Sequence, residues 1–196
     1  MAHSDETLGG RLPLLDKADI SAKQTPHWDA MSSSMGVWAE KIGFASKTPD
    51  GRFIGPFNPM LRSPDLAQSF LQLQLEEQKK TDLADRVRQV VILSVGSAWK
   101  SPYELYAHSA AARAAGFSET CVAALAAGQP SPELDHEEQI AQSLALALTA
   151  RHAVGGDLYA DALWAFGEEG LADFAILAGC YDLICGLLNL FEIPAP

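Results

Sequence analysis

Positively charged residues are scarce in this sequence of 196 residues. It holds 14 Lys and Arg against 25 Asp and Glu, which gives a formal net charge of −11. Binding to nucleic acid needs clustered cations that neutralise phosphates, and the densest cluster here is the pair Lys79–Lys80 at a predicted helix end. We therefore expect no nucleic-acid partner. The 48% hydrophobic and 20% charged residues are typical of a globular protein.

Cysteine motifs and metal-binding patterns are missing. The three cysteines, Cys121, Cys180 and Cys185, are too few for a disulfide framework and form no Cys-x-x-Cys motif. The five histidines lie far apart, and no glycine-rich phosphate loop is present. The first residues are polar and lack the apolar stretch of a signal peptide. We expect a cytoplasmic protein that needs no metal and no cofactor.

The sequence also lacks a long hydrophobic run that is free of polar residues. Its most apolar segment, Leu171 to Phe191, carries Asp173, Asp182 and Asn189. This favours a buried helix over a membrane span, so we expect no membrane partner. A helix that is apolar on nearly every side of so small a domain indicates help from a neighbouring chain. The sequence therefore predicts a homo-oligomer.

What the sequence does contain is a series of segments in which apolar residues recur every three or four positions. Ser-Pro, Gly and Pro residues separate these segments. This pattern predicts an all-α fold with short connections. Residues 1–24 are expected to form an N-terminal tail and residues 25–196 a single all-helical domain. Helices are predicted over residues 26–45, 64–80, 82–99, 101–116, 119–127, 131–152, 158–166 and 169–190.

One loop is unusually apolar. Residues 48–63 contain three prolines and two glycines, which forbid regular structure. The same span carries Phe53, Phe57 and Met60, so something has to cover it. Two interpretations stay open: the loop packs on the core, or it lines a pocket or a subunit contact.

The strongest candidate site is the row Ser101, Glu104 and His108, which share one face of a helix by their spacing of three and four residues. A carboxylate beside an imidazole is a plausible proton-transfer pair. From the spacing alone, a purely structural role in capping the helix is favoured over proton transfer. Ser101, Pro102 and Glu104 have the pattern of a capping box, in which Ser101 and Glu104 only satisfy backbone N–H groups. That interpretation leaves His108 unexplained.

These residues also carry a resemblance. The segments Arg88–Leu93, Ser101–His108 and Ala114–Ser118 resemble the core of the carboxymuconolactone decarboxylase family, which shares the alkylhydroperoxidase-like (AhpD-like) helical fold. Residues 55–61 and 177–189 are similar to the loop and the final helix of one subgroup, so the resemblance runs from about Gly51 to the C-terminus. It implies an all-α fold that assembles as a trimer or hexamer, with pockets at the contacts between protomers.

The chain departs from the peroxidase branch of that family at the residues that matter. The resemblance places the two cysteines of the branch's Cys-x-x-Cys-x-x-x-His motif at Ser101 and Glu104, its histidine at His108 and its upstream glutamate at Gln89. A thiol peroxidase needs one thiolate to attack the peroxide and a second thiol to resolve the product. We therefore expect no thiol peroxidase activity.

The resemblance to the decarboxylase branch implies a cofactor-free acid/base enzyme acting on a small organic acid, lactone or related carbonyl compound. His108 would transfer the proton, and Glu104 would orient it and raise its pKa. Hydrogen-bonding support and pocket walls are expected from Ser101, Tyr103, Gln89, Trp99, Phe53, Phe57, Asn58 and Met60. A cradle for substrate carboxylates would have to come from Arg52, Arg62 or Trp99. The alternative is a non-catalytic, oligomeric ligand-binding or scaffold protein.

Overall fold

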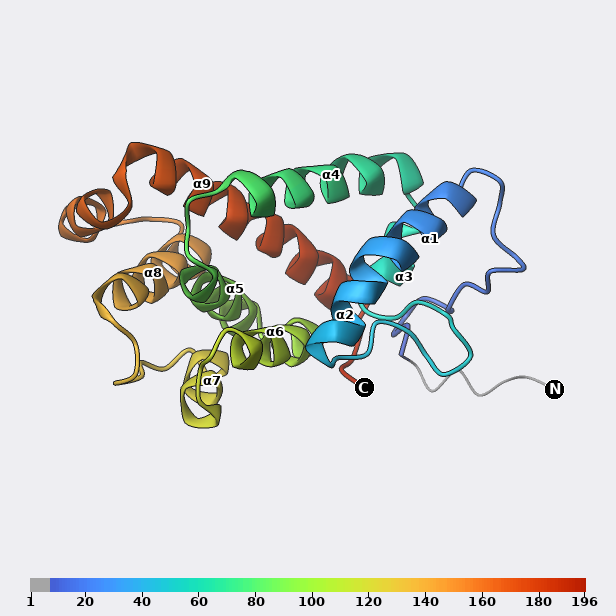
Figure 1. Ribbon diagram of the computed structural model, residues 1–196, viewed down its shortest axis with the longest axis horizontal. Coiled ribbons are helices and arrows are strands. Elements are labelled where there is room, and N and C mark those ends of the chain that lie inside the picture. Colours follow the sequence, from blue (N-terminus) through green and yellow to red (C-terminus); the bar gives the residue numbers. More distant parts are fainter. Residues whose placement is uncertain (1–7) are drawn as a thin grey trace.

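The computed structural model describes residues 8–196 and confirms the all-α prediction. In this part of the chain, extended pairing is limited to one isolated bridge between Lys47 and Phe53. Figure 1 shows the arrangement of the helices. Their bounds are α1 Thr25–Met31, η1 Ser32–Gly36, α2 Val37–Ile42, α3 Phe57–Met60, α4 Pro64–Lys80, α5 Asp85–Trp99, α6 Pro102–Ala114, α7 Glu119–Ala126, α8 His136–Leu146, η2 Ala147–Arg151 and α9 Gly156–Leu190.

Helix α5 is the centre of the structure. It packs against α6, α7, α8 and α9 (Figure 1). The run from Val90 to Val95 is buried on every side of the helix, which explains why these β-branched residues form a helix here: tertiary packing outweighs their weak helical preference. The main core therefore lies around α5, which positions the side chains that this helix turns toward the site.

Helix α9 carries a kink where two helices are predicted from the sequence. Gly167 interrupts it with φ 67° and ψ 179°, a conformation that glycine adopts readily. By length and composition α9 could cross a membrane. Its residues Phe174, Leu177 and Cys185 nevertheless belong to the main core, so in this fold the helix packs as a core element. Its opposite face leaves Ile176, Leu183 and Leu190 exposed.

Helix α4 is held far more loosely than α5. Of its 17 residues only Pro64 and Ala67 are buried, and Leu66 is 74% exposed. It packs against α9, α1 and α3 along one edge of the molecule (Figure 1). The helix therefore covers the site from outside, without contributing much to the core.

The N-terminal part of the described chain, residues 8–24, runs without a helix along the other elements. The backbone N–H of Arg11 donates to the carbonyl of Phe191 at 2.7 Å. Leu14 is buried in a second core cluster with Tyr103 and Leu188. These contacts place residues 8–24 against the end of α9.

The start of α8 differs from the prediction at Ser131–Pro132. The helix begins at His136, with Asp135 as its N-cap. Asp135 Oδ1 accepts from the Glu138 N–H at 2.9 Å, and Glu138 Oε2 accepts from the Asp135 N–H at 3.0 Å. This reciprocal capping box satisfies two of the backbone donors that the first turn of a helix leaves without an intrahelical partner.

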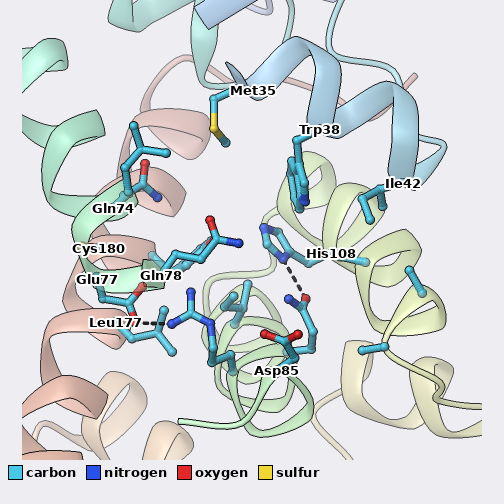
Figure 2. Close-up of a pocket in the computed structure, with 18 of the residues that line it drawn as sticks. Met35, Trp38, Ile42, Gln74, Glu77, Gln78, Asp85, His108, Leu177 and Cys180 are labelled. Carbon is cyan, nitrogen blue, oxygen red and sulfur yellow. Dashed lines mark hydrogen bonds and ion pairs between the residues drawn. The ribbon is translucent and has the colours of Figure 1, made fainter. Parts of the chain in front are cut away.

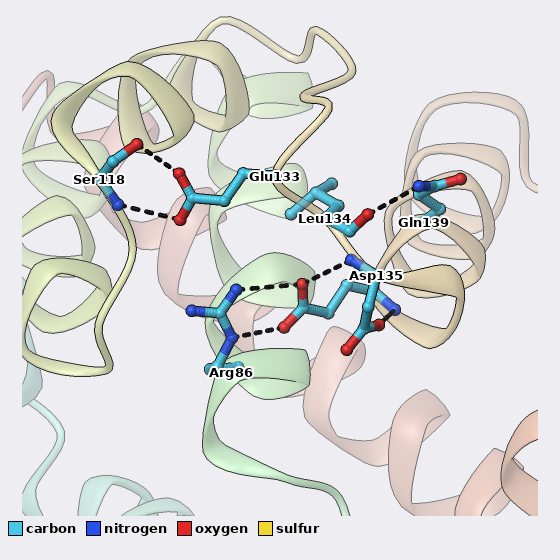
Figure 3. A network of polar contacts seen from close by, with 7 residues as sticks. Arg86, Ser118, Glu133, Leu134, Asp135 and Gln139 are labelled. Carbon is cyan, nitrogen blue, oxygen red and sulfur yellow. Dashed lines mark hydrogen bonds and ion pairs between the residues drawn. The ribbon is translucent and has the colours of Figure 1, made fainter.

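Glu138 also connects α8 to α5. Its carboxylate accepts two hydrogen bonds from Arg86, at 2.6 and 3.2 Å, and its side chain is 2% exposed. Figure 3 shows Arg86 beside Asp135 at the start of α8. The Arg86 guanidinium lies 3.8 Å from the centre of the Phe117 ring, a favourable cation–π position. Nearby, Glu133 accepts hydrogen bonds from the backbone N–H and the hydroxyl of Ser118, the N-cap of α7. These contacts join α5, α7 and α8.

Candidate functional site

A cavity of about 290 Å³ lies between α5, α6 and α9 on one side and η1, α2 and α4 on the other. Figure 2 shows Trp38 and His108 on one wall, facing Gln74, Glu77 and Gln78 of α4. A second, small cavity of about 40 Å³ adjoins the first, and its lining includes Glu104, Tyr103, Phe57 and Met60. His108 lines both cavities, as do Met35, Trp38, Gln74 and Tyr181.

His108 is fixed by contacts on several sides. Its Nδ1 lies 2.9 Å from Gln89 Oε1, so the ring donates its Nδ1–H to this oxygen and keeps a lone pair on Nε2. Nε2 lies 3.3 Å from Glu104 Oε1. The ring packs edge-on against Tyr181, with 5.0 Å between ring centres, and Trp38 lies 5.9 Å away. Little rotational freedom remains for the imidazole.

The capping box predicted at the start of α6 is absent. Ser101 makes no side-chain cap hydrogen bond, and its buried hydroxyl lies beside the Cys185 thiol. Glu104 is 3% exposed, and its Oε1 makes no well-formed hydrogen bond. Instead of reaching back to the cap, the carboxyl group of Glu104 lies toward His108. The structural interpretation of this row is therefore wrong for Glu104.

Burial sets the protonation of the pair. It raises the pKa of Glu104 from 4.5 to about 8, because the charged form has lost its water. It lowers the pKa of His108 from 6.5 to about 3, with a smaller contribution from the positive charge of Arg88. Both groups are neutral near pH 7. This corrects the prediction that Glu104 raises the pKa of His108, since an uncharged carboxyl group exerts no such pull.

An ion pair that the sequence pattern does not indicate lies in the wall of the large cavity. Arg88 Nη1 of α5 pairs with Glu77 Oε1 of α4, and the two side chains are 8% and 6% exposed. Both line the cavity. In the sequence, Arg88 follows Arg86 closely and Glu77 stands in an ordinary charged helix end. Only the packing of α4 over α5 brings Arg88 and Glu77 together.

The predicted site residues fall into two groups. Gln89 lines the large cavity, and Tyr103, Phe57 and Met60 line the small one. The loop of residues 48–63 thus packs on the core and lines a pocket at once. Gly55 in this loop has φ +64°, and a Cβ there would lie 2.2 Å from the Tyr103 ring. The close approach lets the Tyr103 hydroxyl donate to the Ala45 carbonyl at 2.7 Å.

The other predicted wall residues lie elsewhere. Phe53 packs against Trp28 in a separate cluster. Asn58 is buried and accepts a hydrogen bond from the Leu15 N–H. Trp99 donates its indole N–H to Asp182 Oδ1 at 2.7 Å and lies outside both cavities. These three side chains stabilise the fold, and the structure does not bring them to the site.

The predicted carboxylate cradle is also elsewhere. Arg52 pairs with Asp50 near the exposed turn of the loop. Arg62 donates to Asn58 Oδ1 at 2.9 Å. Neither arginine lines either cavity, and the cation at the site is Arg88.

Two of the three cysteines lie near the site. Cys180 lines the large cavity, and Cys185 lies beside Ser101. Burial raises the pKa of both thiols, so neither is a thiolate near neutral pH. Over residues 8–196, no three His, Cys, Asp or Glu side chains converge as a metal site.

Comparison with solved structures identifies the fold. No family model matches the chain, and neither does any curated protein. Among solved structures, the chain is similar to the alkylhydroperoxidase AhpD core of an uncharacterised peroxidase-related protein from Ralstonia eutropha. The TM-score is 0.74 at 16% identity, over 96% of this chain and 93% of that one. A peroxidase-related protein from Silicibacter sp. gives 0.71 at 14% identity, over 96% and 92%.

A third similar structure is the debrominase Bmp8 in complex with 2,3,4-tribromopyrrole, with a TM-score of 0.69 at 16% identity, over 93% of this chain and 90% of that one. The chain therefore has the AhpD-like fold. At sequence identities this low, the comparison shows the fold alone. The activity has to be argued from the residues at the site.

Proposed function

We propose that this protein is a cofactor-free acid/base catalyst of the carboxymuconolactone decarboxylase-like type, acting on a small organic acid, lactone or related carbonyl compound. The observation that carries the proposal is the buried pair of His108 and Glu104, whose Nε2 and Oε1 lie 3.3 Å apart beside two adjoining cavities. Burial keeps both groups uncharged near neutral pH, so each holds one transferable proton.

The pair can work as a relay. A substrate carbonyl oxygen in the large cavity replaces Gln89 as acceptor and takes the Nδ1 proton of His108. At the same time Glu104 gives its proton to Nε2, which leaves a carboxylate. The resulting Nδ1 lone pair then removes a proton from the carbon beside the carbonyl, and Nε2 returns its proton to Glu104. The enol forms and the pair is restored, so no electron carrier is needed.

The names of two similar proteins suggest peroxidase chemistry, but the thiols of this chain do not favour it. Ser101 and Glu104 stand where the resemblance places a cysteine pair. The pKa of the Cys180 thiol beside the cavity is raised by burial, which keeps the attacking thiolate scarce.

The proposal is tested by exchange of carbon-bound hydrogen. Small lactones and cyclic ketones are incubated in D2O with the protein, and loss of the proton signal beside the carbonyl is followed by NMR. His108→Asn is expected to lower the exchange rate by roughly a hundredfold or more, since general acid/base groups contribute about that much. His136→Asn, which changes an exposed histidine on α8, is the matched control.

Equal exchange rates in the wild type and His108→Asn would contradict the assignment. The alternative, a non-catalytic ligand-binding protein, is favoured by one observation. The pKa of His108 is lowered to about 3, so the free protein has no imidazole at this site that titrates near neutral pH. Binding of the test compounds without exchange would support this alternative.

A homo-oligomer, trimer or hexamer, remains part of the proposal. Its support is the exposed apolar face of α9, with Ile176, Leu183 and Leu190, on a helix whose other face packs in the core.

A further inference from the structure

The large cavity contains no free cation among its lining residues. Its charged groups are Arg88, Glu77 and Asp85, one cation and two carboxylates. Arg88 and Glu77 pair with each other and are both almost fully buried, so their charges cancel where a ligand would meet them. Asp85 is exposed at the N-terminal end of α5. A carboxylate that entered this cavity would therefore meet uncompensated negative charge, in a protein of net charge −11.

The remaining polar wall is made largely of carboxamides. Gln74 and Gln78 of α4 face the cavity from one side (Figure 2), and Gln89 of α5 lines it beside His108. A carboxamide both donates and accepts hydrogen bonds and carries no charge. Such a wall suits a neutral carbonyl compound. Trp38 and Leu177 provide apolar contacts for the rest of a small ligand.

We propose that Glu77 is a specificity-determining residue: by occupying Arg88, it closes the cavity to carboxylates and selects neutral lactones, esters or amides. This inference rests on the proposed function, because it assumes that the large cavity is the substrate site. It also narrows the reaction. Decarboxylation requires a carboxylate substrate, so a cavity that excludes carboxylates leaves proton transfer beside a neutral carbonyl group.

The first test needs only the wild-type protein. Binding of benzamide and of benzoate, which have nearly the same shape and differ in charge, is measured at neutral pH by calorimetry and by ligand-observed NMR. Benzamide is expected to bind roughly tenfold more tightly or better, because an unpaired charge in a buried site outweighs a lost neutral hydrogen bond. Equal or tighter binding of benzoate would overturn the inference. The hydrogen-exchange result with His108→Asn would then still decide the proposed function.

The second test removes the negative charge that pairs with Arg88. Glu77→Gln keeps the shape of the side chain and removes its charge, so Arg88 becomes free to bind a carboxylate in a bidentate manner. Benzoate affinity is expected to rise roughly tenfold or more. The control is Glu76→Gln, which removes the same charge from the neighbouring position of α4, where Glu76 pairs outside the cavity with Lys80 at 2.5 Å. This control is expected to leave benzoate binding unchanged.

The double variant Glu77→Gln/Arg88→Gln is expected to lose the gain, which would assign it to Arg88. An equal rise in Glu76→Gln would show a general charge effect and overturn the role of Glu77. If Glu77→Gln does not fold, the wild-type comparison of benzamide with benzoate decides the inference alone. Failure of both probes to bind would overturn the inference and the assignment of the cavity as substrate site together.

Discussion

Replacing Glu104 by glutamine is expected to stabilise the protein progressively as the pH rises, by about 5 kcal/mol relative to the wild type between pH 4.5 and pH 8. The wild-type carboxyl group has its pKa raised by burial from 4.5 to about 8. In this window the unfolded chain has lost the proton and the folded chain still holds it. The free energy of unfolding of the wild type therefore falls by about 1.4 kcal/mol for each pH unit across this window.

His108 produces the opposite slope in the wild type. Its pKa is lowered from 6.5 to about 3, so its contribution to stability is lost as the pH falls through this range. Between pH 4.5 and 6.5 the two slopes cancel. Stability should therefore be greatest there and fall by about 2 kcal/mol on each side, toward pH 8 and toward pH 3. Tyr103, Tyr181 and Cys185 near Glu104 have raised pKa values and stay neutral throughout.

The measurement is urea unfolding at a series of pH values. Glu104→Gln should keep the acidic fall and lose the alkaline one, because its amide has nearly the same shape and does not titrate. His108→Asn should do the reverse. Glu76→Gln, at a half-exposed position of α4, should change neither limb. An alkaline fall of unchanged size in Glu104→Gln would show that this carboxyl group is not buried as a neutral acid.

The parts of the fold that can be predicted from the sequence are those set by local pattern. The predicted helix of residues 64–80 matches α4, because Ser63–Pro64 begins it and Lys79–Lys80 suits its C-terminus. At α8 the same rule fails. Two cap signals stand close together, and the acidic Asp135 with Glu138 satisfies more donors than Ser131 with Pro132. The spacing of residues along the sequence does not show which of two neighbouring cap signals begins the helix.

The candidate site can be predicted only as far as one helix carries it. His108 and Glu104 share α6, so their spacing is sufficient to bring them together. The Arg88–Glu77 pair depends on how α4 lies across α5. Trp38 approaches His108 because α2 packs against α6. Such contacts depend on helix packing angles, which the periodicity of a single helix does not determine.

The apolar loop of residues 48–63 is ambiguous for the same reason. Phe57 lines the small cavity, and Phe53 packs behind it against Trp28. Phe53 lies in an irregular stretch, and Phe57 begins the four-residue helix α3. A helix this short gives no period of three or four residues that would assign either side chain to a face. Only the packing of the loop on the helices separates the two.

The second large effect is expected at the junction of α5, α7 and α8. Glu138→Ala should lower the free energy of unfolding by about 3 kcal/mol or more. The change removes the acceptor of two Arg86 hydrogen bonds and the reciprocal half of the Asp135 cap. It also leaves a cavity at a side chain that is 2% exposed. Thermal and urea unfolding of the purified variant measure the loss.

Two further variants separate these causes. Glu138→Gln keeps the side-chain volume and an acceptor oxygen, so it should recover part of the loss, and the remainder reports the charge of the Arg86 pair. Glu133→Ala removes a neighbouring carboxylate that bonds to Ser118 at the surface, and exposed interactions of this kind contribute little. If Glu133→Ala destabilised the protein as much as Glu138→Ala, the junction would depend on the α7 cap. The buried Arg86–Glu138 pair would then not be what holds α8 to α5.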